Sequence, residues 1–185
     1  MIDQLKEKLP LIRQWINDLL YTSSAQSKSI KEFGFKRLSQ YYSEETLNLA
    51  RVVVADRLPV PPLAALGFTN PQFASFEQGN YGAITYKNTY FIKPEEVHCE
   101  ATHFHELIHV AQWAYLGEEK FILAYAIGLL QAGYRNSPLE VMAYNHAENF
   151  QKNGAPYDVE KSARTELDTI HSFYPGQSPE RLSQK

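Results

Sequence analysis

The sequence predicts an α+β domain that is mainly helical, with a small sheet or hairpin before one central helix. Apolar residues recur at helical spacing through most of the 185-residue chain. Two short runs, AITY and TYFI, flank Lys87 and Asn88, which is the pattern of a β-hairpin with a short turn. A third run, RVVVA from Arg51, is rich in β-branched residues and predicts a buried strand.

Length and composition limit the classes of function. With 44% hydrophobic residues, 185 residues can enclose one substantial core. The net charge is -3, and the lysines and arginines are scattered, so no basic surface for nucleic acid is expected. Uncharged apolar stretches are shorter than the roughly 18 residues of a membrane span. We therefore expect neither a nucleic-acid nor a membrane partner.

The chain start and the cysteine content bear on location. The opening MIDQLKEKLP has acidic residues and lacks the basic lead of a secretory signal. The single cysteine, Cys99, cannot form an internal disulfide, which agrees with a reducing compartment. These features predict a cytoplasmic protein, and they leave its oligomeric state open.

The N-terminal part is expected to be helical. Apolar residues between positions 12 and 20 predict an amphipathic helix with Pro10 in its first turn. We expect a second helix over residues 27–42 and a third capped by Ser43. Clustered prolines follow, and residues 67–79 have the composition of a loop. We divide the chain into an N-terminal helical segment packed on the core (1–60), a core domain (61–175) and a polar tail (176–185).

The C-terminal part is expected to consist of four helices. Pro94 at a first helical position predicts a helix that extends to Leu116 and ends at Gly117. Three further helices are predicted over residues 118–132, 138–152 and 158–171.

The helix that begins near Pro94 contains the stretch ATHFHELIHVAQW, in which His105, Glu106 and His109 form an HExxH pentad. Residues four apart on a helix project side by side, so two imidazoles can bind one metal ion, and the glutamate can take a proton from an activated water. On a helical projection the two histidines lie at the rim of the apolar arc, where a cleft would face them. Two polar residues on a solvated helix face are the alternative.

A catalytic zinc needs a third protein ligand. The stretch SPLEVMAY places Glu140 in the first turn of a downstream helix, where its carboxylate could reach the metal. The same stretch is also a capping box, in which Glu140 would bond back to the amide of Ser137. Both interpretations stay open, and Glu148, two turns later, is the reserve ligand.

The stretches HELIHVAQW and SPLEVMAY resemble the two metal-binding helices of the zincin metallopeptidases. A glutamate supplied by a later helix is similar to the gluzincins, and a group of bacterial predicted zinc metallopeptidases has HELxHVxQ and PLExxA helices of this kind. The resemblance spans about residues 80–150, including the hairpin. The extended pattern of the metzincins is excluded, because Gln112 and Tyr115 stand where it requires glycine and histidine.

The resemblance implies that the core has a zincin-like fold and a metallopeptidase activity. One Zn²⁺ per chain would be held by His105, His109 and Glu140, and Glu106 would act as the catalytic base in hydrolysis of a peptide or protein substrate. The strand at residues 82–86 would align the substrate backbone. Tyr144 stands where the best-known gluzincins carry an aspartate that orients a zinc histidine. Asn145, Glu148 or a backbone carbonyl are left to serve instead.

Two other interpretations compete with the interpretation as an enzyme. One is a non-catalytic zincin-like module that binds or regulates another protein. The other is a helical scaffold protein that binds no metal.

Overall fold

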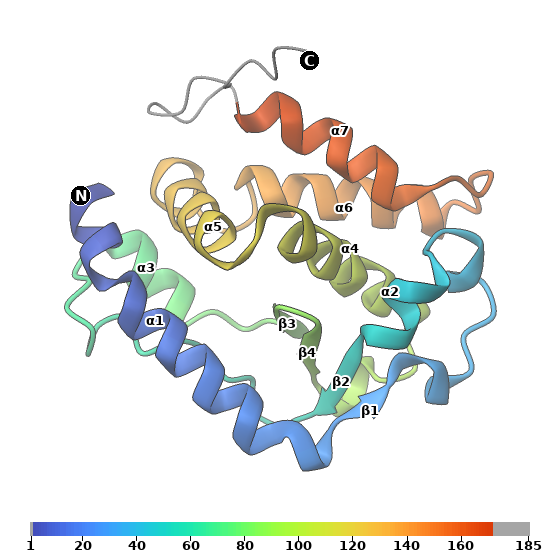
Figure 1. Ribbon diagram of the computed structural model, residues 1–185, viewed down its shortest axis with the longest axis horizontal. Helices are drawn as coiled ribbons and strands as arrows, with labels where there is room; N and C mark the ends of the chain where they lie inside the picture. Colours follow the sequence, from blue (N-terminus) through green and yellow to red (C-terminus); the bar gives the residue numbers. More distant parts are fainter. Residues whose placement is uncertain (1, 172–185) are drawn as a thin grey trace, which may run out of the picture.

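The fold of the protein is described from a computed structural model, in which residues 2–171 are placed (Figure 1). It is mainly helical with one small sheet, which confirms the predicted α+β class. The helices are α1 (Ile2–Ser23), α2 (Glu44–Leu49), α3 (Pro71–Glu77), α4 (Glu100–Leu116), α5 (Glu118–Ala132), α6 (Pro138–Gln151) and α7 (Val159–His171). The strands are β1 (Lys28–Ser29), β2 (Arg51–Val54), β3 (Ala83–Tyr86) and β4 (Thr89–Ile92).

The four strands form one mixed sheet in the order β1-β2-β4-β3. Strands β2 and β4 are parallel, whereas β1 with β2 and β3 with β4 are antiparallel. The predicted strand and hairpin are both confirmed, with Lys87 and Asn88 between the paired residues Tyr86 and Thr89. The hairpin therefore leaves β3 at an edge of the sheet.

Helix α4 is the centre of the domain, and it contacts β3, α5, α6 and α7 (Figure 1). Its first half packs into a core cluster with the sheet, α6 and α7, through residues such as Phe104 and Ile108. Its last turns pack into a second cluster with α1, α3 and α5, through Trp113 and Leu116. The histidines of the pentad therefore lie on the element that joins the two clusters.

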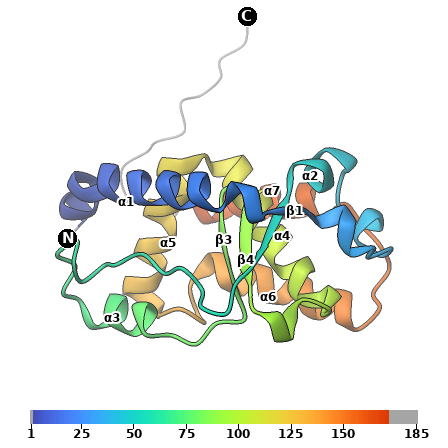
Figure 2. The same ribbon diagram turned by 90° about the horizontal axis from the view of Figure 1, so that it is seen from below.

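Helices α1 and α3 both pack on α5, and α1 runs along one long side of the molecule (Figure 2). The buried residues of α1 recur at three- and four-residue spacing, and they are Leu5, Leu9, Ile12 and Ile16. Because this stripe begins at Leu5, packing extends the helix toward the N-terminus. The expected place of Pro10 in the first turn is therefore wrong, and Pro10 lies inside α1.

The helix expected over residues 27–42 is wrong. Residues 28–29 form β1, and short 3₁₀ turns follow at Ile30–Phe33 and Leu38–Gln40. Ser29 forms a capping box with Glu32, which starts the first of these turns, and Gly34 ends it in the left-handed region with φ 71°. Local capping and pairing with β2 thus replace a continuous helix.

Two further boundaries differ from expectation. The stretch expected as a loop contains α3, where Pro71 occupies the first turn and the side chain of Asn70 accepts from the amide of Gln72 at 2.9 Å. The helix expected from Pro94 begins at Glu100, because residues 94–96 form a separate 3₁₀ turn. The helices α5, α6 and α7 confirm the other predictions for this part of the chain.

The sheet includes strands from both sides of the division expected near residue 60, since β2 pairs with β4. The division itself remains a prediction, and the tail at 176–185 lies outside the described residues. Among residues 2–171, no helix combines the length and the apolar character that crossing a bilayer requires.

Candidate metal centre

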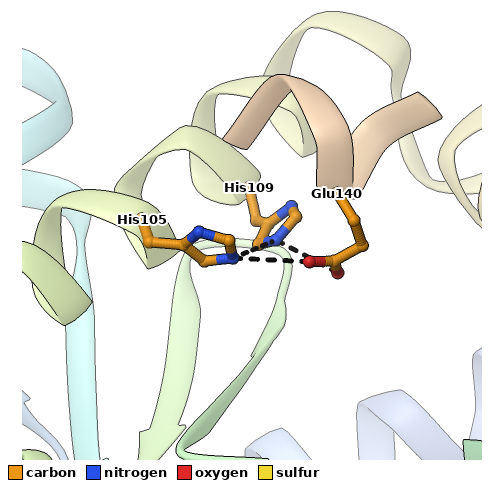
Figure 3. Close-up of side chains that lie close together, drawn as sticks. All are labelled: His105, His109 and Glu140. Carbon is orange, nitrogen blue, oxygen red and sulfur yellow. Dashed lines mark hydrogen bonds and ion pairs between the residues drawn. The ribbon is translucent and has the colours of Figure 1, made fainter. Parts of the chain in front are cut away.

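Two histidines and a glutamate converge between α4 and α6 (Figure 3). His105 and His109 project from adjacent turns of α4, and Glu140 comes from the first turn of α6. The two imidazole Nε2 atoms are 3.2 Å apart, and they lie 3.4 Å and 3.3 Å from the carboxylate oxygens of Glu140. One potential ligand atom from each residue falls within 4.8 Å of the others.

This cluster is buried. His105 is 8% exposed, His109 5% and Glu140 2%. Charged or polar groups that are withdrawn from water to this degree need partners, because their desolvation is costly. The three side chains are therefore held by mutual contacts and by the neighbours described below.

The backbone of α6 comes close to α5 at Gly128. A Cβ atom added to Gly128 would lie 3.0 Å from the Cβ of Ser137 and 3.1 Å from the Cδ of Pro138. Ser137 and Pro138 immediately precede the turn that carries Glu140. The absence of a side chain at Gly128 thus allows the start of α6 to approach the site.

The carboxylate of Glu140 points into the cluster and away from the helix cap. In the described chain, Ser137 makes no side-chain capping bond, and its amide bonds instead to the carbonyl of Tyr134 at 3.1 Å. Glu148, the reserve ligand, is exposed and pairs with Lys152 at 2.6 Å. The structure therefore brings Glu140, and not Glu148, to the two histidines.

The electrostatics of the cluster favour a negative charge on Glu140 and a positive charge on His109. Burial opposes ionisation of Glu140, but His109 and His105 outweigh it and lower the pKa of this carboxyl well below its usual range. Burial likewise lowers the pKa of His109, but Glu140, Glu106 and a hydrogen bond to Gln112 outweigh it and raise this pKa to about 9. Without a metal ion, His109 is therefore protonated at neutral pH.

Gln112 connects His109 to the backbone of α6. Its Oε1 lies 2.8 Å from Nδ1 of His109, and its Nε2 donates to the carbonyl of Leu139 at 3.0 Å. When Nδ1 carries the proton of this contact, Nε2 of His109 is the nitrogen available to a metal. Sequence reasoning missed this role, although the glutamine of the HELxHVxQ pattern marks the position.

Glu106 lies beside the cluster and is held by the sheet. It is 4% exposed, and the hydroxyl of Thr85 on β3 donates to its Oε2 at 2.6 Å. Burial raises the pKa of Glu106, whereas His105, His109 and the bond from Thr85 lower it in part, and the net shift is upward. Nothing in the sequence pattern indicated the contact with Thr85.

Tyrosines surround Glu140. The hydroxyl of Tyr125 on α5 donates to Oε1 of Glu140 at 2.7 Å. The ring of Tyr144 packs against His105 with 4.6 Å between centroids, and Tyr144 is also hydrogen-bonded to Tyr134. Tyr144 occupies the sequence position where the best-known gluzincins carry an aspartate. It contacts His105 through its ring. Tyr125 was missed because a tyrosine in an apolar helix gives no signal of its partner.

A metal ion fits the chemistry of this donor set. Two imidazole nitrogens and one carboxylate oxygen are a typical set for a catalytic zinc, which keeps a further position open. Oε2 of Glu140 is buried and makes no hydrogen bond within residues 2–171, although Nε2 of His105 lies 3.4 Å from it as an ion-pair partner. A buried carboxylate oxygen without a donor is costly unless a cation neutralises it.

The other histidines and the cysteine near the pentad lie outside the cluster. His98 and Cys99 are exposed. His103 is fully buried on another side of α4, where Nδ1 lies 2.6 Å from the hydroxyl of Tyr90 and Nε2 lies 2.9 Å from the carbonyl of Val97. These contacts hold His103 in the core and away from the cluster.

No protein-family model matches the chain, and comparison with curated proteins and with solved structures found no significant match.

Proposed function

We propose that this protein is a zinc-dependent metallopeptidase that hydrolyses peptide bonds with an activated water. The observation that carries the proposal is the convergence of two imidazole Nε2 atoms and a carboxylate within 4.8 Å, beside the separate buried carboxylate of Glu106. His105, His109 and Glu140 would hold one zinc ion per chain. Bound zinc would supply Lewis-acid chemistry, which lowers the pKa of water and polarises a carbonyl group.

Glu106 is the general base in this proposal. It takes the proton from the attacking water and passes it to the amine that leaves when the peptide C–N bond breaks. A base works best when its pKa lies near the operating pH, and the burial that raises the pKa of Glu106 acts in that direction. The bond from Thr85 fixes one oxygen of Glu106 and leaves the other to face the water.

The edge strand β3 is the proposed guide for the substrate backbone. In a hairpin with a two-residue turn, the pair next to the turn is hydrogen-bonded, so the backbone groups of every second residue face outward. In β3 these residues are Ala83 and Thr85, and Thr85 also contacts the proposed base. An extended peptide added to this edge would therefore lie next to Glu106.

The substrate is a peptide or protein, and nucleic acid and membranes are not expected as partners. We also propose a cytoplasmic location, from the single cysteine.

The proposal is tested with purified protein. We expect about one zinc per chain and hydrolysis of an unfolded protein or a mixed peptide library. Glu106→Gln should keep the zinc and lose hydrolysis, because the amide cannot accept the proton. Glu119→Gln, at an exposed position on α5, is the matched control and should change neither property. Zinc below about 0.2 per chain that titration does not restore contradicts the proposal.

A non-catalytic binding or regulatory module is the second candidate. It is favoured by the burial of the cluster, in which each of the three residues is less than 10% exposed. Stable zinc with no hydrolysis of any peptide or unfolded protein would select this candidate.

A further inference from the structure

An apolar cavity of about 90 Å³ adjoins the candidate metal centre. Its lining includes Glu106, His109 and Glu140 from the centre, and Leu5, Ile12 and Ile16 from α1. Helices α1, α3 and α5 enclose this part of the molecule (Figure 2). The cavity therefore extends from the centre to the N-terminal helix, which lies outside the stretch that resembles zincins.

The tyrosines that line the cavity present their rings, because their hydroxyls are engaged elsewhere. Tyr81 donates to the carbonyl of Phe76 at 2.9 Å, and Tyr86 donates to the carbonyl of Pro59 at 2.8 Å. Tyr125 donates to Glu140 at 2.7 Å, and Tyr134 is hydrogen-bonded to Tyr144. These hydroxyls are thus not free to bind a polar guest.

The rest of the wall carries no charge that could pair with a guest. Outside Glu106, His109 and Glu140, the described lining residues include no acid, lysine, arginine or further histidine. The indole Nε1 of Trp113 is a buried donor without a partner in the described chain, and it is neutral. Beyond Glu106, His109 and Glu140, a charged side chain in this cavity would lose its hydration without a partner, which disfavours it strongly. The wall therefore selects an uncharged, apolar group.

The volume of the cavity limits which apolar group can enter it. A dry apolar cavity of roughly 150 Å³ holds one benzene molecule. A cavity of about 90 Å³ is smaller than that, so it suits a branched aliphatic group better than an aromatic ring.

We propose that this cavity binds a branched aliphatic side chain, that of valine, leucine or isoleucine, from the substrate residue next to the scissile bond. This proposal rests on the proposed peptidase function for the source of the side chain. Helix α1 forms one wall of the specificity pocket. Its position is held by an ion pair between Arg13 and Glu118 at 3.3 Å and a bond from Lys87 to Asn17 at 2.6 Å.

The first test measures binding without catalysis. Isobutane, which has the carbon skeleton of the leucine side chain, is titrated into metal-free Glu106→Gln protein with ¹³C-labelled methyl groups. We expect saturable shifts of the methyl signals of Ile12 and Leu129, which both line the cavity. Ala126→Leu or the smaller Ala126→Val, on the α5 wall, should abolish or weaken these shifts at least fivefold, with melting curves to confirm folding. The absence of saturable shifts in the unfilled protein overturns the proposal.

The second test measures cleavage preference with a peptide library that varies one residue on each side of the scissile bond. Leucine should exceed lysine and phenylalanine by about tenfold or more at one position. Ile12→Ala enlarges the cavity and should raise the phenylalanine-to-leucine ratio about tenfold. Leu9→Ala is the matched control, because Leu9 is buried on the same helix but does not line the cavity. An equal response to both substitutions, or cleavage indifferent to side chain, overturns the proposal.

The two tests separate this inference from the proposed function. Isobutane binding that Ala126→Leu blocks supports the aliphatic pocket even when no peptide is cleaved, and the missing cleavage then counts against the peptidase alone. Cleavage without aliphatic preference supports the peptidase and removes the pocket proposal.

Discussion

Gln112 lies between the two helices of the candidate metal centre, with its Oε1 2.8 Å from Nδ1 of His109. The other end of the same amide donates to the carbonyl of Leu139, one residue before Glu140. One side chain thus contacts both His109, a proposed ligand on α4, and the turn of α6 that carries Glu140. This arrangement leads to the first of four predictions.

Gln112→Leu should weaken zinc binding by about 10- to 100-fold, which is the usual effect of removing a group that orients a metal ligand. The leucine removes both contacts and leaves the carbonyl of Leu139 without its donor. Competition with a chelator of known affinity measures the change. Gln131→Leu, at an exposed position on α5, is the matched control and should bind zinc normally. Equal affinities of Gln112→Leu and the unchanged protein would refute the orienting role.

Glu140→Gln should lose most bound zinc, whereas Glu148→Gln should retain it. Both glutamates lie on α6, but only Glu140 faces the histidines, and Glu148 pairs with Lys152 at the surface. Zinc per chain after dialysis, measured by elemental analysis, separates the two variants. Retention of zinc by Glu140→Gln would mean that a different group supplies the third ligand.

Zinc binding should become tighter as the pH rises from about 6 to 8, by close to tenfold per unit. The neighbouring carboxylates raise the pKa of His109 to about 9, so its ring carries a proton through this range in the metal-free protein. Binding must release that proton, and a higher pH makes the release easier. Calorimetry in buffers of different ionisation enthalpy should detect about one released proton at pH 7. Affinity that does not change with pH would contradict a protonated His109.

Thr85→Val should slow hydrolysis by about tenfold without changing the zinc content. The hydroxyl that it removes donates to Glu106, and such a bond to a charged group contributes on the order of 1.5 kcal/mol. Loss of the bond raises the pKa of Glu106, so the base stays protonated to a higher pH. The acidic limb of the pH–rate profile should therefore shift to higher pH.

Thr89→Val is the control for this substitution. Thr89 is equally buried on β4, but its hydroxyl contacts Asn88 and not the base. The same upward shift of the acidic limb in both variants would show that the effect arises from the sheet and not from Glu106.

Much of the site could be predicted because it depends on short spacings. His105 and His109 are one helical turn apart, so their common direction follows from helix geometry alone. Glu140 was found from its place at the start of a helix, although the sequence left its capping role open. The inward turn of Glu140 became clear only from its contacts with the two histidines.

The contacts that support these residues could not be predicted, because they join distant parts of the chain. Thr85 reaches Glu106 from the sheet, and Tyr125 reaches Glu140 from the intervening helix. Helical periodicity says which side of a helix is buried, but not which side chain of another element meets it. For the same reason, no sequence pattern indicated that α1 lines a cavity beside the centre.

The fold was predicted best where a periodic apolar pattern was long. Helices α5, α6 and α7 and the hairpin lie where their patterns placed them. The error over residues 27–42 has a local cause, since the capping box of Ser29 and the left-handed Gly34 favour separate short turns. Composition alone also hid α3, which starts from the side-chain cap of Asn70.

Gly128 contributes no functional group, yet it limits how far α5 and α6 stand apart at the turn before Glu140. The reach of a carboxylate is short, so a few tenths of an ångström between two backbones can decide whether it meets the histidines. In the proposed metal centre, the strength of metal binding therefore depends on the spacing of the two helices as much as on the ligands. A homologous chain with alanine in place of Gly128 would therefore differ in the strength of metal binding, although this position is distant in sequence from both histidines.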